Sequence, residues 1–238
     1  VRKSEAPNVY VFGAHLAGWT KMQHMNIVLH FCFTGRRYHT MKNFLLFFIF
    51  CCDKIVLTRR TSMNIWHDLD KKRVTPEKFT AVIEISKGGK NKYELDKETG
   101  MLRLDRVLYT STHYPANYGF IPKTYAEDND PLDVLVLCQE QILPLTLVEC
   151  YPIGILEMLD NDESDEKIIA VPVNDPSYCG YKDVSELPSH LFDEISHFFE
   201  VYKILEDKHT AVQKISDRSV AIRSIKDSIE RYEEKFSN

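Results

Sequence analysis

The chain lacks the features that mark membrane-spanning and disulfide-rich proteins. Its strongly apolar stretch, residues 44–52, is nine residues long, whereas a membrane-spanning helix needs about 20 apolar residues. Of the six cysteines, the last three, Cys138, Cys150 and Cys179, do not have the spacing of metal ligands. We interpret these three as reduced thiols of a cytosolic protein. The sequence therefore predicts a cytoplasmic protein that does not associate with membranes.

The chain also lacks an excess of basic residues. It has 30 Lys and Arg against 35 Asp and Glu, a formal net charge of −5. Residues 1–62 contain nine of the basic residues and two of the acidic ones, so the rest of the chain contains 21 and 33, a net charge of −12. Nucleic-acid binding requires a basic face, and this charge argues against it. An acidic domain that binds an anion needs cations between its own charge and that of the ligand.

The most informative segment is the acidic stretch 127–133, which precedes an apolar strand. Asp128, Asp130 and Asp133 lie within six residues, and in an extended segment the first two side chains point the same way. Pro131 disfavours a helix and allows Asp133 to turn inward at the start of the strand. Grouped carboxylates repel one another unless cations lie among them, and such oxygen ligands favour Mg²⁺, Mn²⁺ or Ca²⁺ over Zn²⁺. The stretch therefore predicts a divalent-metal site.

Two other interpretations of this stretch exist. Asp-Asn-Asp-Pro is typical of a turn, so the acids could form a solvated loop before the strand. A calcium-binding EF-hand is the second, and it does not fit. Counted from Asp128, the sixth position is Asp133, where the loop needs glycine, and the twelfth is Gln139, where it needs glutamate.

From Trp66 onward the chain resembles the family I soluble inorganic pyrophosphatases. The resemblance covers about three quarters of the chain and follows the family's order in seven blocks: residues 81–85, 91–96, 104–106, 114–120, 128–134, Asp160 with 165–167, and 197–203. It implies a hydrolase of phosphate metabolism, an inorganic diphosphatase that converts pyrophosphate to two orthophosphates. The implied mechanism is Mg²⁺-dependent, with a metal-bridged hydroxide attacking in line. The implied cofactor is several Mg²⁺ per subunit, with Mn²⁺ or Zn²⁺ as possible substitutes.

The resemblance also implies the role of each site residue. Asp130 matches the carboxylate that accepts the proton of the attacking water, and we expect burial among like charges to raise its pKa unless the metals counter that effect. Asp133 matches a ligand shared by two metals, and the metal ligands as a set are Asp128, Asp133, Asp160 and Asp165. Glu84 and Glu94 match outer or water-mediated positions. The residues that match those holding the two phosphoryl groups are Lys92, Arg106, which can grip bidentately, Tyr118, Lys167, Tyr202 and Lys203.

The pattern of apolar residues predicts strands followed by helices, which is an α+β arrangement. The expected strands cover residues 79–86, 93–96, 101–109, 133–137, 146–158 and 167–173, and the expected helices cover 188–205 and 217–236. The resemblance sharpens this to a five-stranded, closed β-barrel of OB type with flanking C-terminal helices.

Residues 1–62 carry no block of the family. We interpret them as a non-domain segment, expected to be disordered, that is either translated upstream sequence before Met63 or a targeting peptide; a folded N-terminal domain is the least favoured reading. The pyrophosphatase domain is then residues 63–238, the length of bacterial-type members. We therefore expect a homo-oligomer, with a hexamer favoured over a dimer. The localisation would be organellar instead of cytoplasmic if residues 1–62 are a transit peptide.

Three rival functions belong to other classes. An OB-fold oligonucleotide binder would interleave basic and aromatic residues on its strands, which the net charge of −12 argues against. A structural ion binder would keep Asp128 and Asp133 but would not need the phosphoryl-binding residues together, namely Lys92, Arg106, Tyr118 and Tyr202. A broader phosphohydrolase is the nearest rival, and the size of the accepted substrate distinguishes it.

Overall fold

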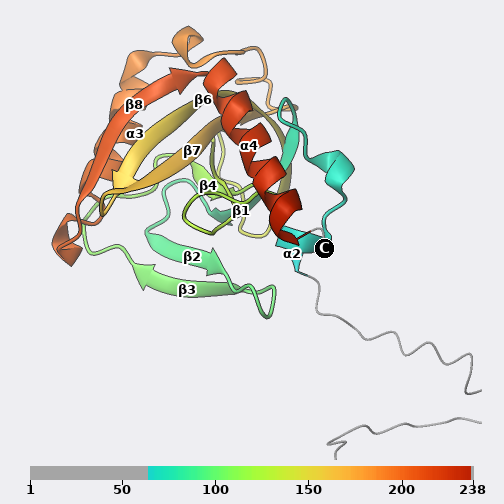
Figure 1. The fold of residues 1–238 in the computed structure, drawn as a ribbon. Helices are drawn as coiled ribbons and strands as arrows, with labels where there is room; N and C mark the ends of the chain where they lie inside the picture. Colours follow the sequence, from blue (N-terminus) through green and yellow to red (C-terminus); the bar gives the residue numbers. More distant parts are fainter. Residues whose placement is uncertain (1–63, 237–238) are drawn as a thin grey trace, which may run out of the picture. The chain divides into compact units, whose positions relative to one another are not determined.

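The structure, a computed structural model, describes residues 64–236 (Figure 1). The predictions for residues 1–62 lie outside the described residues and stay predictions. The described elements, in chain order, are α2 (Ile65–Asp68), η1 (Lys71–Arg73), β1 (Phe79–Ile85), β2 (Asn91–Leu95), β3 (Leu102–Val107), β4 (Asn117–Phe120), β5 (Asp133–Val136), β6 (Leu147–Asp160), β7 (Glu163–Pro172), η2 (Val184–Glu186), α3 (Ser189–Val201), η3 (Ile204–Glu206), β8 (Thr210–Asp217) and α4 (Arg218–Phe236).

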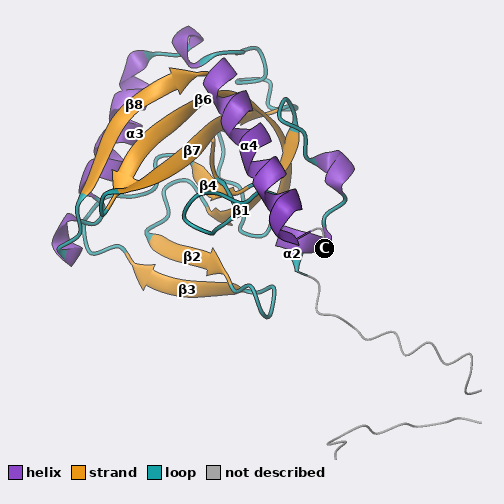
Figure 2. Cartoon of the chain, viewed as in Figure 1, coloured by secondary structure: helices purple, strands orange, loops and turns teal. Residues whose placement is uncertain are grey.

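The strands form a mixed six-stranded sheet in the order β1-β4-β5-β7-β6-β8, together with a separate hairpin of β2 and β3 (Figure 2). The β5–β7 pair is parallel, and the other pairs are antiparallel. Strand β1 also pairs with β6. Five strands therefore pair in a cycle: β1 with β4, β4 with β5, β5 with β7, β7 with β6, and β6 with β1. Strand β8 pairs with β6 and lies outside this cycle.

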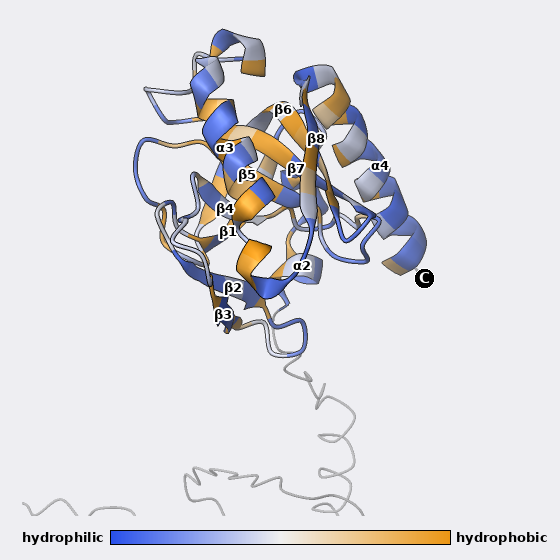
Figure 3. Ribbon diagram, turned by 90° about the vertical axis from the view of Figure 1, so that its left-hand side faces the viewer, coloured by the Kyte–Doolittle hydropathy of each residue, from blue (hydrophilic) through white to orange (hydrophobic). Residues whose placement is uncertain are grey.

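Both faces of the central strands are buried, which explains why their sequences are almost continuously apolar. Val134 and Val136 of β5 pack in one cluster with Ala221 and Ile225 of α4. Leu135, between the two valines, belongs to a second cluster that includes buried residues of α3. The apolar colours of Figure 3 follow these strands, whereas the outer side of α4 is hydrophilic. None of the helices formed within residues 64–236 is both long and apolar enough to cross a membrane.

Strand β4 requires a glycine where it approaches β1. A Cβ atom added at Gly119 would lie 1.9 Å from the carbonyl oxygen of Val82, far inside any van der Waals contact. The ladder between these strands shifts register between Ile83 and Ile85. This irregularity surrounds Glu84, whose side chain is buried. Bulges of this kind re-aim a side chain within a sheet.

The strands and helices expected from the pattern are present, with shifts at their ends, in a mixed sheet with helices. Two strands were not predicted. Strand β4 is four residues long and contains asparagine and glycine, which disfavour strands. Strand β8 has five polar residues and four exposed positions. Helix α3 ends at Val201 instead of 205, because a 3-10 turn follows and Asp207 adopts a left-handed φ of 55°.

Candidate active site

Asp133 and Lys167 are brought together by the parallel pairing of β5 and β7. The two residues are register partners, and the ammonium of Lys167 lies 2.7 Å from Oδ2 of Asp133. The hydroxyl of Tyr118, on the neighbouring strand β4, donates to the same oxygen. Burial and the adjacent Asp133 hold the pKa of Tyr118 well above its usual value, so this hydroxyl keeps its proton. Three strands thus deliver an acid, a cation and a hydroxyl donor to one point.

Lys167 also binds Asp165, two residues earlier on the same strand, where side chains share one face. Its ammonium lies 2.8 and 3.0 Å from the two oxygens of that carboxylate. Lys167 is only 2% exposed. Burial alone lowers the pKa of Lys167, but Asp133 and Asp165 outweigh it and hold the pKa well above the ordinary value. The buried ammonium is therefore a fixed positive charge between two acids.

The acids nevertheless exceed the cations around them. Asp128 is an exposed residue, but partial burial of its carboxyl group raises its pKa to about 6, against the hydrogen bond from the Asp130 N–H, and the neighbouring Asp133, Asp130 and Asp165 add to the rise. Burial also raises the pKa of Asp165, with Asp133 adding to it and Lys167 opposing it. Raised carboxyl pKa values of this kind indicate a site that additional positive charge would stabilise.

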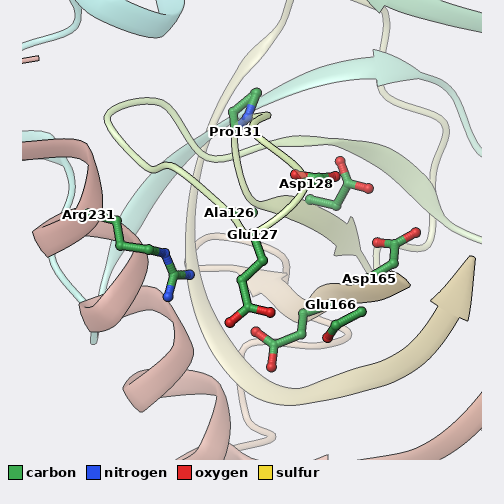
Figure 4. A pocket seen from close by; sticks show the side chains of 9 residues that line it. Ala126, Glu127, Asp128, Pro131, Asp165, Glu166 and Arg231 are labelled. Atoms are coloured by element: carbon green, nitrogen blue, oxygen red, sulfur yellow. The ribbon is translucent and has the colours of Figure 1, made fainter. Parts of the chain in front are cut away.

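Asp128, Asp133 and Asp165 line one pocket, which supplies only oxygen ligands (Figure 4). Such ligands suit Mg²⁺ and similar hard cations. As the side chains stand, no three Asp, Glu, His or Cys residues within 64–236 converge closely enough to hold a metal ion; Lys167 occupies the space between two of the candidate ligands. The donor chemistry fits the expected metal, and binding requires the acids to close around it.

Asp130 does not lie where the sequence predicted. Residues 126–130 form a turn in which the Ala126 N–H donates to the Asp130 carbonyl at 2.8 Å and Asn129 has a φ of 71°. Asp128 and Asp130 are thus not two residues of one extended segment. The Asp130 side chain is 54% exposed and pairs with Lys97 of the β2–β3 turn. The expectation that Asp130 is buried among like charges was wrong.

A second charged cluster lies on the β2–β3 hairpin. Lys92 and Arg106 are register partners, and Lys92 lies 2.5 Å from Glu94 and 3.5 Å from Asp105. Arg106 binds Asp105 through Nη1 and Glu206 of η3 through Nε, the latter at 2.9 Å. Its Nη2 is buried without a hydrogen-bond partner among the described residues. Two carboxylates thus already contact two of the three nitrogens of Arg106, and its remaining N–H groups are the donors that a bidentate contact would use.

Asp160 ends β6 directly before a tight turn. Asn161 and Asp162 both have positive φ, 51° and 68°, as a two-residue hairpin of type I′ requires. Asp160 binds the ammonium of Lys203, and burial lowers the pKa of Lys203 even though Asp160 opposes that effect. At the end of the β6–β7 hairpin, Asp160 therefore lies beside the buried ammonium of Lys203.

Tyr202 follows the last residue of α3 and is 4% exposed. Its ring stacks on Phe198 at 5.3 Å between centroids, so this predicted site residue is also a core residue. Burial raises the pKa of Tyr202, Lys167 opposes the rise, and Asp160 and Asp165 add to it.

Glu84 is a buried carboxyl group between the two clusters. Its Oε1 accepts the Leu95 N–H at 2.7 Å. Burial, with Asp133 and Glu94 adding to it, raises the pKa of Glu84 to about 8. Glu94 is less buried and pairs with Lys92 and Arg103. Glu84 is thus neutral over much of the acid and neutral pH range.

Several residues with direct contacts to the predicted ones were missed, Arg103 beside Glu94 among them. Asp105 lies beside Arg106 within a matched block, and this adjacency was an available signal. Glu206 reaches Arg106 across 100 residues of sequence, and its position depends on η3, so no local pattern indicates it. Lys97 was assigned only to a hairpin turn, yet it pairs with Asp130.

Comparison with known proteins gives one consistent result. A family model described as inorganic pyrophosphatase matches residues 81–233. Soluble inorganic pyrophosphatase 2 of Chlamydomonas reinhardtii is 48% identical over 178 residues, which cover 75% of this chain and 93% of that protein.

Solved structures give the same match. An inorganic pyrophosphatase from Helicobacter pylori is 43% identical and superposes with a TM-score of 0.65, covering 66% of this chain and 95% of that one. The inorganic pyrophosphatase of Thermus thermophilus is 40% identical, with a TM-score of 0.66 and coverage of 73% and 98%.

Proposed function

Since the chain belongs to the inorganic pyrophosphatase family, we propose that it hydrolyses inorganic pyrophosphate to two orthophosphates. One observation carries the proposal beyond family membership: the acids Asp128, Asp133 and Asp165 line one pocket, and Lys167 and Tyr118 contact one of them directly. A substrate made of two linked phosphoryl groups needs both kinds of partner. Acids hold cations, and cations and hydroxyl donors stabilise phosphoryl oxygens.

Mg²⁺ is the cofactor that the donor set fits best, in several copies per subunit, with Mn²⁺ or Zn²⁺ as substitutes. Bound there, it would lower the pKa of water and offset charge on the phosphoryl oxygens. Asp128, Asp133 and Asp165 hold the cofactor in this proposal, and Asp160 joins them when substrate is present. Glu84 and Glu94 act through water from the outer side.

Asp130 is the proposed acceptor of the proton from the attacking water. Its exposed carboxylate lies on the loop that also carries Asp128. It is therefore in contact with solvent and, along the chain, close to a proposed metal ligand. Its present partner is Lys97, an exposed pairing of the kind that contributes little to stability. Exchange of that partner for water therefore costs little.

In this proposal the phosphoryl groups are held by six residues, all of which except Tyr202 now bind carboxylates. Lys167 and Lys203 are buried and paired with Asp133 and Asp160, and binding of metal to these acids leaves the lysines available to phosphoryl oxygens. Nη2 of Arg106, which is buried and has no partner among the described residues, is a further donor. The full set in this proposal is Lys92, Arg106, Tyr118, Lys167, Tyr202 and Lys203.

The finer points of architecture belong to the same proposal. The cyclic pairing of β1, β4, β5, β7 and β6 supports a closed five-stranded barrel of OB type, with α3 and α4 outside it. The domain is residues 63–238, and its length favours a hexamer over a dimer. We place the enzyme in the cytoplasm, or in an organelle if residues 1–62 act as a transit peptide.

The direct test is release of orthophosphate from pyrophosphate by the full chain, with Mg²⁺ and with a chelator. Fast release with Mg²⁺, abolished by the chelator and absent with ATP or a sugar phosphate, is the expected result. Equal release from ATP would replace the proposal with a broader phosphohydrolase. No release from a folded protein that binds Mn²⁺ would replace it with a structural ion binder.

A further inference from the structure

Tyr125 is fixed to helix α4 through both of its main-chain groups. Its N–H donates to the carbonyl of Ser228 at 2.9 Å, and its carbonyl accepts Nε of Arg231 at 2.9 Å. Nη2 of Arg231 donates to the Ser228 hydroxyl, also at 2.9 Å. Ser228 is completely buried. One peptide segment is therefore held from two sides by a single turn of helix.

Tyr125 is also where the loop with Asp128 and Asp130 begins. The Asn129 N–H donates to the Ala126 carbonyl at 3.2 Å, and the Tyr125 hydroxyl donates to the side chain of Asn129. Together with the Ala126–Asp130 bond, these contacts make residues 125–130 a compact unit. A small rotation at Tyr125 would move the whole unit, and both acids with it.

Arg231 faces the same pocket as the acids. Among the described residues that line this pocket, it is the single basic one, and five are acidic: Glu127, Asp128, Asp133, Asp165 and Glu166. Figure 4 shows its side chain reaching from α4 toward the loop and Glu127. Its hydrogen bonds nevertheless go to a main-chain carbonyl and a hydroxyl group. This geometry suits holding the backbone in place.

We infer that Arg231 is a positioning residue, which sets Asp128 and Asp130 relative to Asp133 and Asp165 by holding the Tyr125 carbonyl. The inference rests on the proposed function for its consequence in catalysis. The role is separate from the stability of the fold, because α4 is already anchored by Ala221 and Ile225 in the apolar core, whereas Arg231 is only partly buried. Arg231 acts on the reacting groups through the loop and touches none of the predicted phosphoryl ligands.

The test compares Arg231→Gln with Arg231→Lys and with the control Arg223→Gln. Arg223 lies on the same helix, is exposed, and makes no hydrogen bond or ion pair within the described part of the chain. In Arg231→Gln, we expect faster hydrogen exchange of the Ala126 and Asn129 amides in metal-free protein. We also expect Mn²⁺ to bind about five-fold more weakly by calorimetry, the effect of losing one ordinary hydrogen bond. Arg231→Lys should restore part of both effects.

A second variant leaves α4 intact. Tyr125→Phe removes the hydroxyl bond to Asn129 and should change exchange and Mn²⁺ affinity in the same direction. In pyrophosphate hydrolysis, both variants should need more Mg²⁺ for half-maximal rate, while Arg223→Gln behaves as the wild type. The inference would be overturned if Arg231→Gln and Arg223→Gln had the same amide exchange rates and the same Mn²⁺ affinity.

Failure of the proposed function would give a different result: the wild-type protein would bind Mn²⁺ but release no phosphate from pyrophosphate.

Discussion

Lys167 and Asp133 face each other across two parallel strands, with Nζ 2.7 Å from Oδ2, and the lysine side chain is 2% exposed. The same ammonium contacts Asp165. Without metal, this one residue therefore separates two acids at the centre of the candidate site.

Replacing Lys167 by methionine should be strongly destabilising in chelator, by about 3 kcal/mol, because it leaves the partly buried Asp133 and Asp165 without their cation. Mg²⁺ should reduce that loss, since it supplies the missing positive charge. Urea unfolding with and without Mg²⁺ measures both values. Lys214→Met is the matched control: its partner is Glu157 and its side chain is 61% exposed, so a change below about 0.5 kcal/mol is expected. A loss independent of Mg²⁺ would contradict the placement of metal between these acids.

Asp133→Asn keeps the shape of the side chain and removes its charge. If Asp133 is a metal ligand, Mn²⁺ should bind at least about 10-fold more weakly, since even loss of a residue that supports a ligand has this effect. The rate of pyrophosphate hydrolysis at fixed Mg²⁺ should fall steeply. Calorimetry and phosphate release measure the two quantities. Asp162→Asn is the control, because Asp162 lies in an exposed turn where positive φ suits asparagine; it should change neither the Mn²⁺ affinity nor the rate. If Asp133→Asn bound Mn²⁺ as tightly as the wild type, Asp133 would not be a metal ligand.

Glu84 should make the metal-free protein less stable as pH rises. Its pKa is about 8 in the folded chain against 4.5 ordinarily. The folded state therefore holds a proton that the unfolded state has lost. The stabilisation is complete below about pH 4.5 and disappears as pH rises to about 8, at about 1.4 kcal/mol per pKa unit.

Glu84→Gln preserves an acceptor for the Leu95 N–H and removes this titration. Urea unfolding in chelator at about pH 5 and about pH 8 should therefore show a smaller fall in stability for the variant than for the wild type. Asp128 contributes a remaining fall in both proteins, because its pKa is raised to about 6. Identical pH dependence in the two proteins would show that Glu84 is ionised in the fold.

Gly119→Ala should prevent close pairing of β1 and β4. The new Cβ would lie 1.9 Å from the Val82 carbonyl oxygen and 2.8 Å from its carbon, and backbone atoms cannot move aside as a flexible side chain does. We expect a loss of about 3 kcal/mol or more, the upper end of overpacking effects. Gly180→Ala is the control, because its Cβ would meet no atom of residues 64–236 within 4 Å. Thermal unfolding of both variants checks the difference.

The sequence predicted the elements whose periodicity reflects packing. Helix α4 repeats apolar residues at helical spacing, and its buried positions include Ile225 and Tyr232. Strand β5 is a continuous apolar run because both of its faces are covered. Strand β4 was missed because its place in the sheet depends on the absence of a side chain at Gly119. Glycine has a low β propensity, so the sequence pattern argued against a strand there.

The contacts among the predicted site residues could be foreseen only in part. Their chemical types follow from the sequence, but their partners depend on register and on turns. Asp133 and Lys167 meet because β5 and β7 pair in parallel, which no local pattern indicates. Asp130 points to Lys97 because residues 126–130 turn instead of extending. Glu206 reaches Arg106 only through the 3-10 turn after α3.

The parallel pairing of β5 and β7 has a consequence for folding kinetics. Strands β6 and β7 form a local hairpin through Asn161 and Asp162, and hairpins form within microseconds, on the order of 1–10 μs. The β5–β7 ladder instead joins segments separated by the whole of β6, so a longer loop must close first. Lys167 consequently meets Asp165 early and Asp133 late. Acquisition of metal affinity during refolding should therefore mark completion of the central sheet and lag behind formation of the hairpin.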